Sequence, residues 1–206
     1  MQDIEKALAD INNIRNQVAA GRMFKGFGPA VIALTGVFAI LLMSAQLFWP
    51  DALAENDVML LGWWIFAAFL SVVFIWIEML ALSRRHHGGL ADSMITNAVQ
   101  IFMPIGAAGA AITLVLLKNQ VELAWVLPGI WQLLIALGIF SSLHYLPKYV
   151  TLAGAWYFIA GTIVLQLGSL GHPLSPWHMG IPFALGQWLM AYILYKTLDA
   201  SHDRFR

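Results

Sequence analysis

Few side chains in this sequence could carry chemistry, and most of them stand inside long apolar runs. The stretch FIWIEMLALSRRHH, residues 74–87, places one carboxylate, Glu78, in such a run and follows it with Arg84 and Arg85. A carboxylate in hydrocarbon costs a few kcal/mol, so it should face other helices and find a partner there. Glu78 is therefore the first candidate for a ligand-coupled or proton-coupled group.

Polar residues at a similar predicted depth on the next two apolar runs are candidate partners for this carboxylate. We expect an inner-leaflet cluster made of Glu78, Asn97, Gln100, Ser141 and His144. Arg84 or Arg85 would lie close enough to pair with it. Two interpretations stay open: Glu78 is a structural tie that fixes helix packing, or Glu78 and His144 form a protonatable pair at the mouth of a cavity.

A second polar region follows the fifth apolar run, in GSLGHPLSPWHMGIP at residues 168–182. Its glycines and prolines predict a rigid, non-helical turn on the outer side. His172 and His178 lie in this turn, but no third ligand accompanies them, so we predict no metal site. Three glutamines in separate apolar runs could line an outward cavity or bond across helices: Gln132, Gln166 and Gln187.

Motifs of membrane-embedded enzymes are missing from the sequence, and we predict no catalytic residue. The chain has no cysteine, which excludes thiol catalysis, thiolate metal sites and covalently attached c-type haem. The apolar runs contain no aspartate, and no G-x-S-G motif occurs. A b-type haem held by His144 and a loop histidine is a less favoured alternative. The sequence leaves any cofactor unknown.

The composition assigns these residues to helices in a membrane. Of 206 residues, 60% are hydrophobic and only 11% are charged, whereas soluble domains carry about 25% charged residues. A span needs about 20 apolar helical residues. We therefore predict an all-α bundle with six transmembrane helices at about 29–50, 58–82, 94–117, 124–143, 150–169 and 179–198. The net charge of zero gives no indication of a nucleic-acid partner.

The basic residues predict the orientation of the bundle. Ten of the eleven Lys and Arg residues fall on one side of the predicted spans, with Lys118 as the exception. Arg84, Arg85 and Lys148 act as topology anchors on the basic side. By the positive-inside rule both termini are cytoplasmic, and we expect a bacterial inner (plasma) membrane protein.

Residues 1–28 precede the first span and are too polar for a cleaved signal peptide. Within them, Ile4, Ile11 and Val18 recur every seven residues. This pattern predicts an amphipathic helix over 3–20 that lies on the cytoplasmic surface or packs against a partner helix. With a short tail at 199–206, the chain reads as one membrane domain, 1–206.

Two further patterns concern helix surfaces. In the predicted third span, Gly106-x-x-x-Ala110 and Ala107-x-x-x-Ala111 would permit close helix approach. Tryptophans near the outer ends of the predicted spans are typical of an interfacial aromatic belt. These are Trp49, Trp63, Trp64, Trp125 and Trp177.

From these features we expect a non-enzymatic polytopic membrane protein. It would bind a hydrophobic small molecule or serve as an accessory subunit of a membrane complex. The alternative is a transport component with a gate formed by Glu78 and His144. A haem- or quinone-binding electron-transfer protein is the third possibility. The expected partners are the lipid bilayer and another membrane protein or a second copy of the chain.

Overall fold

The computed structural model describes residues 28–85, 90–143 and 146–202, with only the backbone at 82–85, 90–98 and 198–202. The predicted surface helix at 3–20 lies outside the described residues. In the described ranges the chain forms helices and no strand. The elements are α2 (Pro29–Phe48), α3 (Pro50–Leu53), α4 (Asp57–Arg85), α5 (Leu90–Asn119), η1 (Val121–Val126), α6 (Leu127–Ser141), η2 (Lys148–Val150), α7 (Thr151–Ser169) and α8 (Trp177–His202).

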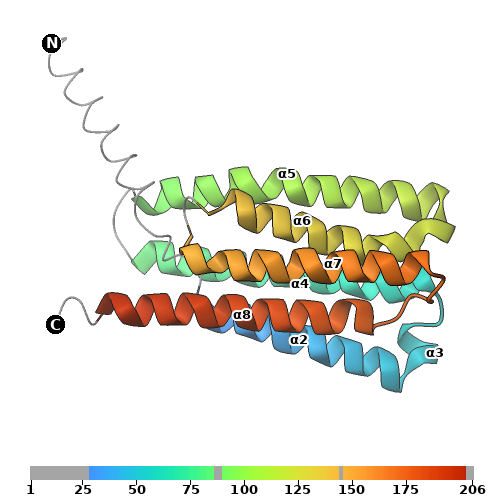
Figure 1. Ribbon diagram of the computed structural model, residues 1–206. Helices are drawn as coiled ribbons and strands as arrows, with labels where there is room; N and C mark the ends of the chain where they lie inside the picture. The colour runs from blue at the N-terminus through green and yellow to red at the C-terminus, as the bar shows by residue number, and fades with distance from the viewer. Residues whose placement is uncertain (1–27, 86–89, 144–145, 203–206) are drawn as a thin grey trace, which may run out of the picture.

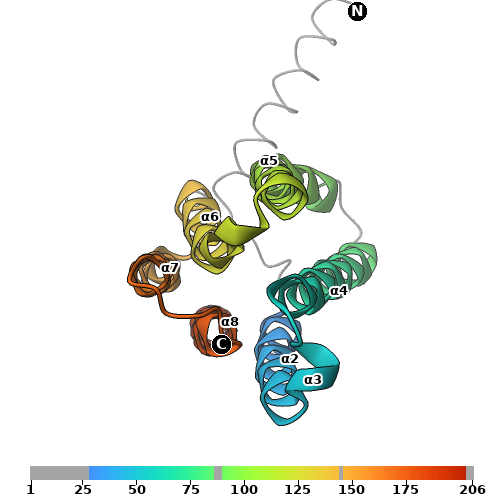
Figure 2. The same ribbon diagram turned by 90° about the vertical axis from the view of Figure 1, so that its right-hand side faces the viewer.

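The long helices run side by side along one axis (Figure 1). Viewed end on, they form a ring in the order α2, α4, α5, α6, α7 and α8, and neighbours in the ring contact each other (Figure 2). The closest-packed pairs are α2 with α8 and α6 with α7. The first and last helices of the described chain are therefore neighbours.

Five helical segments in the described ranges are long and apolar enough to cross a membrane: Pro29–Phe48, Asp57–Ala81, Val99–Asn119, Val121–Ser141 and Lys148–Ser169. The all-helical prediction is confirmed. The sixth predicted span, at about 179–198, coincides with α8, which does not meet the same measure of apolarity. Polar and weakly apolar residues, among them Gln187 and Lys196, interrupt the apolar sequence of α8.

The chain ends α7 with a Schellman motif. Gly171 adopts φ 83°, a left-handed conformation that glycine reaches without a Cβ penalty. The Gly171 N–H donates to Gly168 O, and the His172 N–H donates to Leu167 O. The connection from α7 to α8 comprises residues 170–176, and α8 begins at Trp177. The prediction of a non-helical turn through residue 182 was therefore wrong in its second half.

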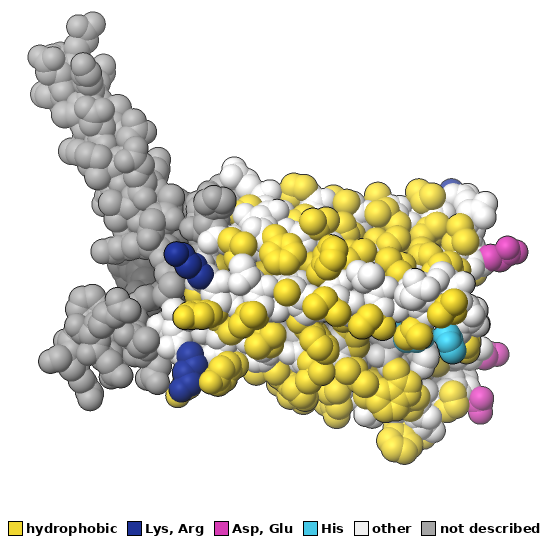
Figure 3. Space-filling view, viewed as in Figure 1, with side chains coloured by type: hydrophobic (Ala, Val, Ile, Leu, Met, Phe, Trp, Pro, Cys, Tyr) yellow, Lys and Arg dark blue, Asp and Glu magenta, His cyan; other side chains and the backbone are white. Residues whose placement is uncertain are grey.

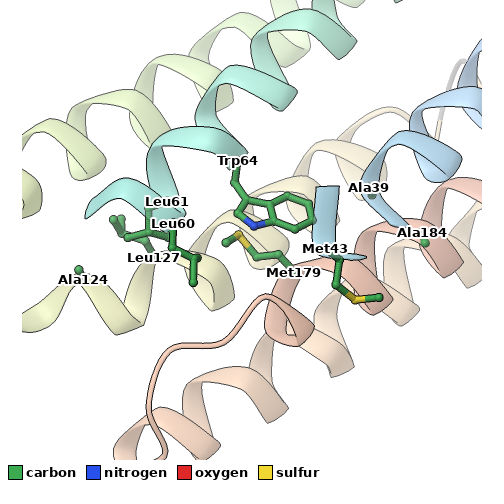
Figure 4. Close-up of a cluster of buried hydrophobic side chains, with 9 residues drawn as sticks. All are labelled: Ala39, Met43, Leu60, Leu61, Trp64, Ala124, Leu127, Met179 and Ala184. Atoms are coloured by element: carbon green, nitrogen blue, oxygen red, sulfur yellow. The ribbon is translucent and has the colours of Figure 1, made fainter. Parts of the chain in front are cut away.

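Buried apolar side chains fill two main parts of the bundle. One cluster joins α2, α4, α6 and α8 near the end that holds α3 (Figure 4). It contains Ala39, Met43, Leu60, Leu61, Trp64, Ala124, Leu127, Met179 and Ala184. The other cluster joins α6, α7 and α8 around Tyr157. Trp64, predicted to sit at the membrane interface, is only 5% exposed, so that prediction was wrong for this residue.

Helices α6 and α7 approach each other through two glycines. A Cβ built on Gly161 would lie 2.9 Å from Gly129 O, and one built on Gly129 would lie 2.8 Å from Gly161 O. Both backbones therefore meet without intervening side chains, as in the small-residue packing of membrane helices. This contact lies between the two candidate spans with the highest buried fractions.

The surface of the bundle separates apolar and charged side chains. On the face shown in Figure 3, apolar side chains cover the length of the helices. Acidic side chains gather at one end, and most of the basic ones drawn lie at the other. The helix flanks are thus suited to lipid, and the two ends differ in charge.

Candidate functional site

Glu78 is half-buried near the basic end of α4, and its described partner is on α2. The backbone N–H of Gly28 donates to Glu78 Oε2 at 3.2 Å. Gly28 is the N-cap residue of α2 and has no side chain to bond the first N–H groups of that helix. Glu78 therefore supplies a carboxylate at the start of α2, from a helix that follows it in the sequence.

This contact has a clear electrostatic basis. The first N–H groups of a helix lack intrahelical partners, and the helix dipole favours a negative charge there. No acidic residue occupies the first turn of α2, so Glu78 provides the missing charge. A side chain on Gly28 would overlap the Glu78 carboxylate. The two residues form an interhelical cap, which supports the interpretation of Glu78 as a structural tie.

The other predicted members of the inner cluster do not join Glu78 in the described residues. Gln100 on α5 and Ser141 at the end of α6 are exposed, and neither bonds to Glu78. The side chain of Asn97, and His144 as a whole, lie outside the described residues, as do the side chains of Arg84 and Arg85. Of the topology anchors, Lys148 is described and exposed at the start of η2.

We expect Glu78→Ala to lower the free energy of unfolding by about 1–2 kcal/mol, the usual cost of a lost helix cap. Glu78→Gln keeps an oxygen that can accept the Gly28 N–H. This variant should therefore lose only the stabilisation that the negative charge gives to the start of α2, about 0.5 kcal/mol. Thermal unfolding in detergent without added ligand measures both variants. Equal losses in the two variants would contradict an interhelical cap.

The first turns of α8 are held by a side chain from α6. Pro182 lies inside α8 and has no N–H, so the carbonyl of His178, four residues earlier, loses its helical donor. Gln132 Nε2 donates to that carbonyl at 2.9 Å. This bond explains why the helix continues through a proline that the sequence pattern assigned to a turn.

Helix α7 adds two more bonds to the same region of α8. Trp156 Nε1 donates to Pro182 O at 2.9 Å, and the Tyr157 hydroxyl donates to Phe183 O at 3.4 Å. The side chain of Gln187 on α8 lies beside the same hydroxyl. Three donors from two helices therefore secure the part of α8 around Pro182.

The three glutamines predicted at the outer side have different surroundings. Gln132 is fully buried and bonds across helices, while its Oε1 has no partner among the described residues. Gln187 is half-buried beside Tyr157, and Gln166 is exposed on α7. The glutamines differ in burial and contacts, and Gln132 acts as a tie between α6 and α8.

A fourth glutamine, Gln46, is the most complete polar tie, and the sequence analysis missed it. It is 1% exposed, and its Oε1 accepts the indole N–H of Trp64 at 2.9 Å. Its Nε2 donates to Leu60 O at 3.1 Å and to Leu53 O at 3.3 Å. One amide thus joins α2, α3 and α4. The available signal was a lone amide in the first apolar run.

The described residues contain no group of three His, Asp or Glu side chains placed to hold a metal ion. His172 is exposed in the connection after α7, and His178 is half-buried at the start of α8. The connection between α7 and α8 lies at the end of the bundle where the acidic side chains gather (Figures 1 and 3). In the described bundle, buried amide and indole side chains bond one helix to another, whereas the serine and threonine hydroxyls bond carbonyls of their own helix.

An all-helical ring with five helices able to cross a bilayer and polar ties inside it defines a class of protein, the helical membrane proteins. Comparison with known proteins adds nothing to this assignment. No protein-family model, no curated protein and no solved structure matches the chain.

Proposed function

We propose that the protein is a non-enzymatic subunit of a membrane complex and that α5 is the helix through which it assembles. In this proposal the sixth span is the part of α8 at about 179–198, both termini are cytoplasmic, and the membrane is a bacterial inner membrane. The basic residues of the predicted connections and the charge difference between the two ends support this orientation.

The observation that carries the proposal is the low burial of α5. Only 11% of the residues in its most apolar window are buried, against 44% for the segment that contains α6. One side of α5 packs on α6, where Gly109 faces Leu134 and the Trp131 indole N–H donates to Thr113 Oγ1 at 2.9 Å. Helix α5 also contacts α4 and η1, and the side opposite Gly109 and Thr113 is left exposed.

That free side of α5 is better suited to a helix than to lipid. Its exposed residues include Gln100, Pro104, Ala107, Ala111 and Leu114. Small residues allow close helix approach, and an amide in a span gains from a hydrogen-bonding partner. Gly106 and Ala110 are also exposed, so the predicted close approach is not made within the described chain.

The partner that fits this side best is a second copy of the chain. All copies enter the membrane in the same orientation, so two α5 helices would meet in parallel with Gln100 at matching depth. An amide both donates and accepts, so two Gln100 side chains can bond to each other. A twofold interface uses the same surface on both subunits, and this surface meets that requirement.

A transport gate at Glu78 and His144 has less support. The Glu78 carboxylate is used by Gly28 at the start of α2, which gives it a structural task. Binding of a hydrophobic small molecule is the remaining alternative, and a retained ligand would be visible as added mass in the experiment below.

We expect Ala107→Leu to lower the dimer fraction about tenfold, because the larger side chain separates the paired helices. Native mass spectrometry of the full chain in mild detergent measures how many copies of the chain associate. Ala68→Leu is the matched control, since Ala68 is exposed on α4, and it should leave the dimer unchanged. A monomeric wild-type chain, with or without a different bound protein, would contradict pairing of two copies.

A further inference from the structure

The start of α8 is closed by a histidine that bonds backward along the chain. The backbone N–H of Ser175 donates to His178 Nδ1 at 3.3 Å, and the His178 N–H donates to Ser175 O at 3.0 Å. The pattern resembles a capping box, in which the side chain three residues into the helix bonds the N-cap N–H. Here an imidazole takes the place of the usual Glu or Gln.

This bond requires a neutral imidazole. A backbone N–H can only donate, so Nδ1 must offer a lone pair and the ring proton must sit on Nε2. A protonated imidazole carries hydrogen on both nitrogens and has no acceptor left. Protonation of His178 and the bond from Ser175 therefore exclude each other.

Few charged groups surround His178. Helices α2, α6 and α7, which pack against α8, contain no Asp, Glu, Lys or Arg, and η2, which also contacts α8, carries Lys148. Tyr157 of α7 is titratable and bonds to Phe183 O of α8. At the same end of the bundle, Asp57 of α4 and Glu122 of η1 are exposed. His172 in the connection acts on His178 as a like charge when protonated. No described carboxylate forms an ion pair with His178.

We propose that the start of α8 is an acid-sensitive latch, in which protonation of His178 releases the Ser175 N–H and loosens residues 170–178. The carbonyl of His178 stays bound to Gln132 in the core, so the rest of α8 is held in place. The latch lies at the acidic end of the bundle, which is the outer face in the proposed orientation.

The surroundings of His178 set the direction of its response. Burial, and secondly the repulsion from His172, lower the pKa of His178 below its ordinary value of 6.5. The folded state therefore binds this proton less readily than the unfolded state. The bond to the neutral imidazole therefore makes its full contribution to the free energy of unfolding above pH 6.5. This contribution decreases as the pH falls below 6.5 and is lost once the pH passes below the lowered pKa of the folded state.

Hydrogen exchange of the full chain in nanodiscs at a series of pH values from 7.5 to 4.5, corrected for intrinsic rates, tests the latch. Protection at residues 170–178 should fall about fivefold at pH 4.5, the effect of one lost helix cap, while α7 stays unchanged. His178→Gln restores a capping-box acceptor that does not titrate, so its protection should be independent of pH. His172→Gln removes the repulsion and should move the transition to higher pH.

Equal pH responses of the wild type and His178→Gln would overturn the proposal, because the exposed carboxylates and not His178 would then cause the change. Constant protection of the wild type would overturn it as well. If His178→Gln does not fold, the shift with His172→Gln decides: no upward movement of the transition contradicts the latch.

Discussion

Replacing Gly161 by leucine should lower the free energy of unfolding by about 3 kcal/mol, the upper end of ordinary overpacking costs. A Cβ at this position would lie 2.9 Å from Gly129 O and 3.0 Å from Gln132 Cβ. The first of these atoms belongs to a helix backbone and cannot rotate away. Helix α7 would have to move off α6, and Gln132 would be displaced from the His178 carbonyl.

Unfolding of the full chain in mixed detergent micelles measures this loss. Gly62→Leu is the matched control, because Gly62 is exposed on α4 and a Cβ there meets nothing within 4 Å. The control should be neutral or slightly stabilising, since leucine favours a helix more than glycine does. Similar losses in the two variants would contradict close glycine packing of α6 on α7.

Replacing Gln46 by leucine should also cost about 3 kcal/mol. The change removes three hydrogen bonds and leaves the buried Trp64 N–H without an acceptor, and each such orphaned group costs about 1–3 kcal/mol. The Leu53 carbonyl loses a donor as well. Because Gln46 joins α2, α3 and α4, the loss should appear where α2 ends and α4 begins, next to α3.

A double-mutant cycle separates this bond from packing. Trp64→Phe removes the indole N–H and keeps an aromatic ring, so the double variant Gln46→Leu with Trp64→Phe has no orphaned donor. The loss of unfolding free energy in the double variant should be smaller than the sum of the two single losses by about 1 kcal/mol or more. Additive losses would show that the Gln46–Trp64 bond contributes nothing.

The positions of the helices could be predicted because their apolar length is a local property. The run at about 150–169 corresponds to α7 at Thr151–Ser169, and the run at about 29–50 corresponds to α2 at Pro29–Phe48. The sixth span predicted at about 179–198 lies within α8, but the non-helical turn predicted through residue 182 overlaps the first turns of this helix. Pro182 usually breaks a helix, and the bond from Gln132 that compensates for it comes from another helix.

The partners of the polar residues could not be predicted, because they depend on which helices are neighbours. Glu78 was expected to bond to the third or fourth span, but α4 also contacts α2 in the ring. Its partner, Gly28, offers a backbone N–H and no side chain, so it leaves no signal in the sequence. Trp64 is of a residue type that is typical of membrane interfaces, but its indole can be buried because Gln46 accepts the hydrogen bond from its N–H.

Cysteine cross-linking in native membranes tests pairing through α5 most directly. The chain has no cysteine of its own, so a single Ala107→Cys variant reports on one position, and Ala68→Cys on α4 is its control. Pairing of two copies predicts that Ala107→Cys is oxidised to a disulfide-linked dimer of twice the chain mass, while Ala68→Cys stays monomeric. Equal cross-linking of the two variants, or none in Ala107→Cys, would contradict assembly through α5.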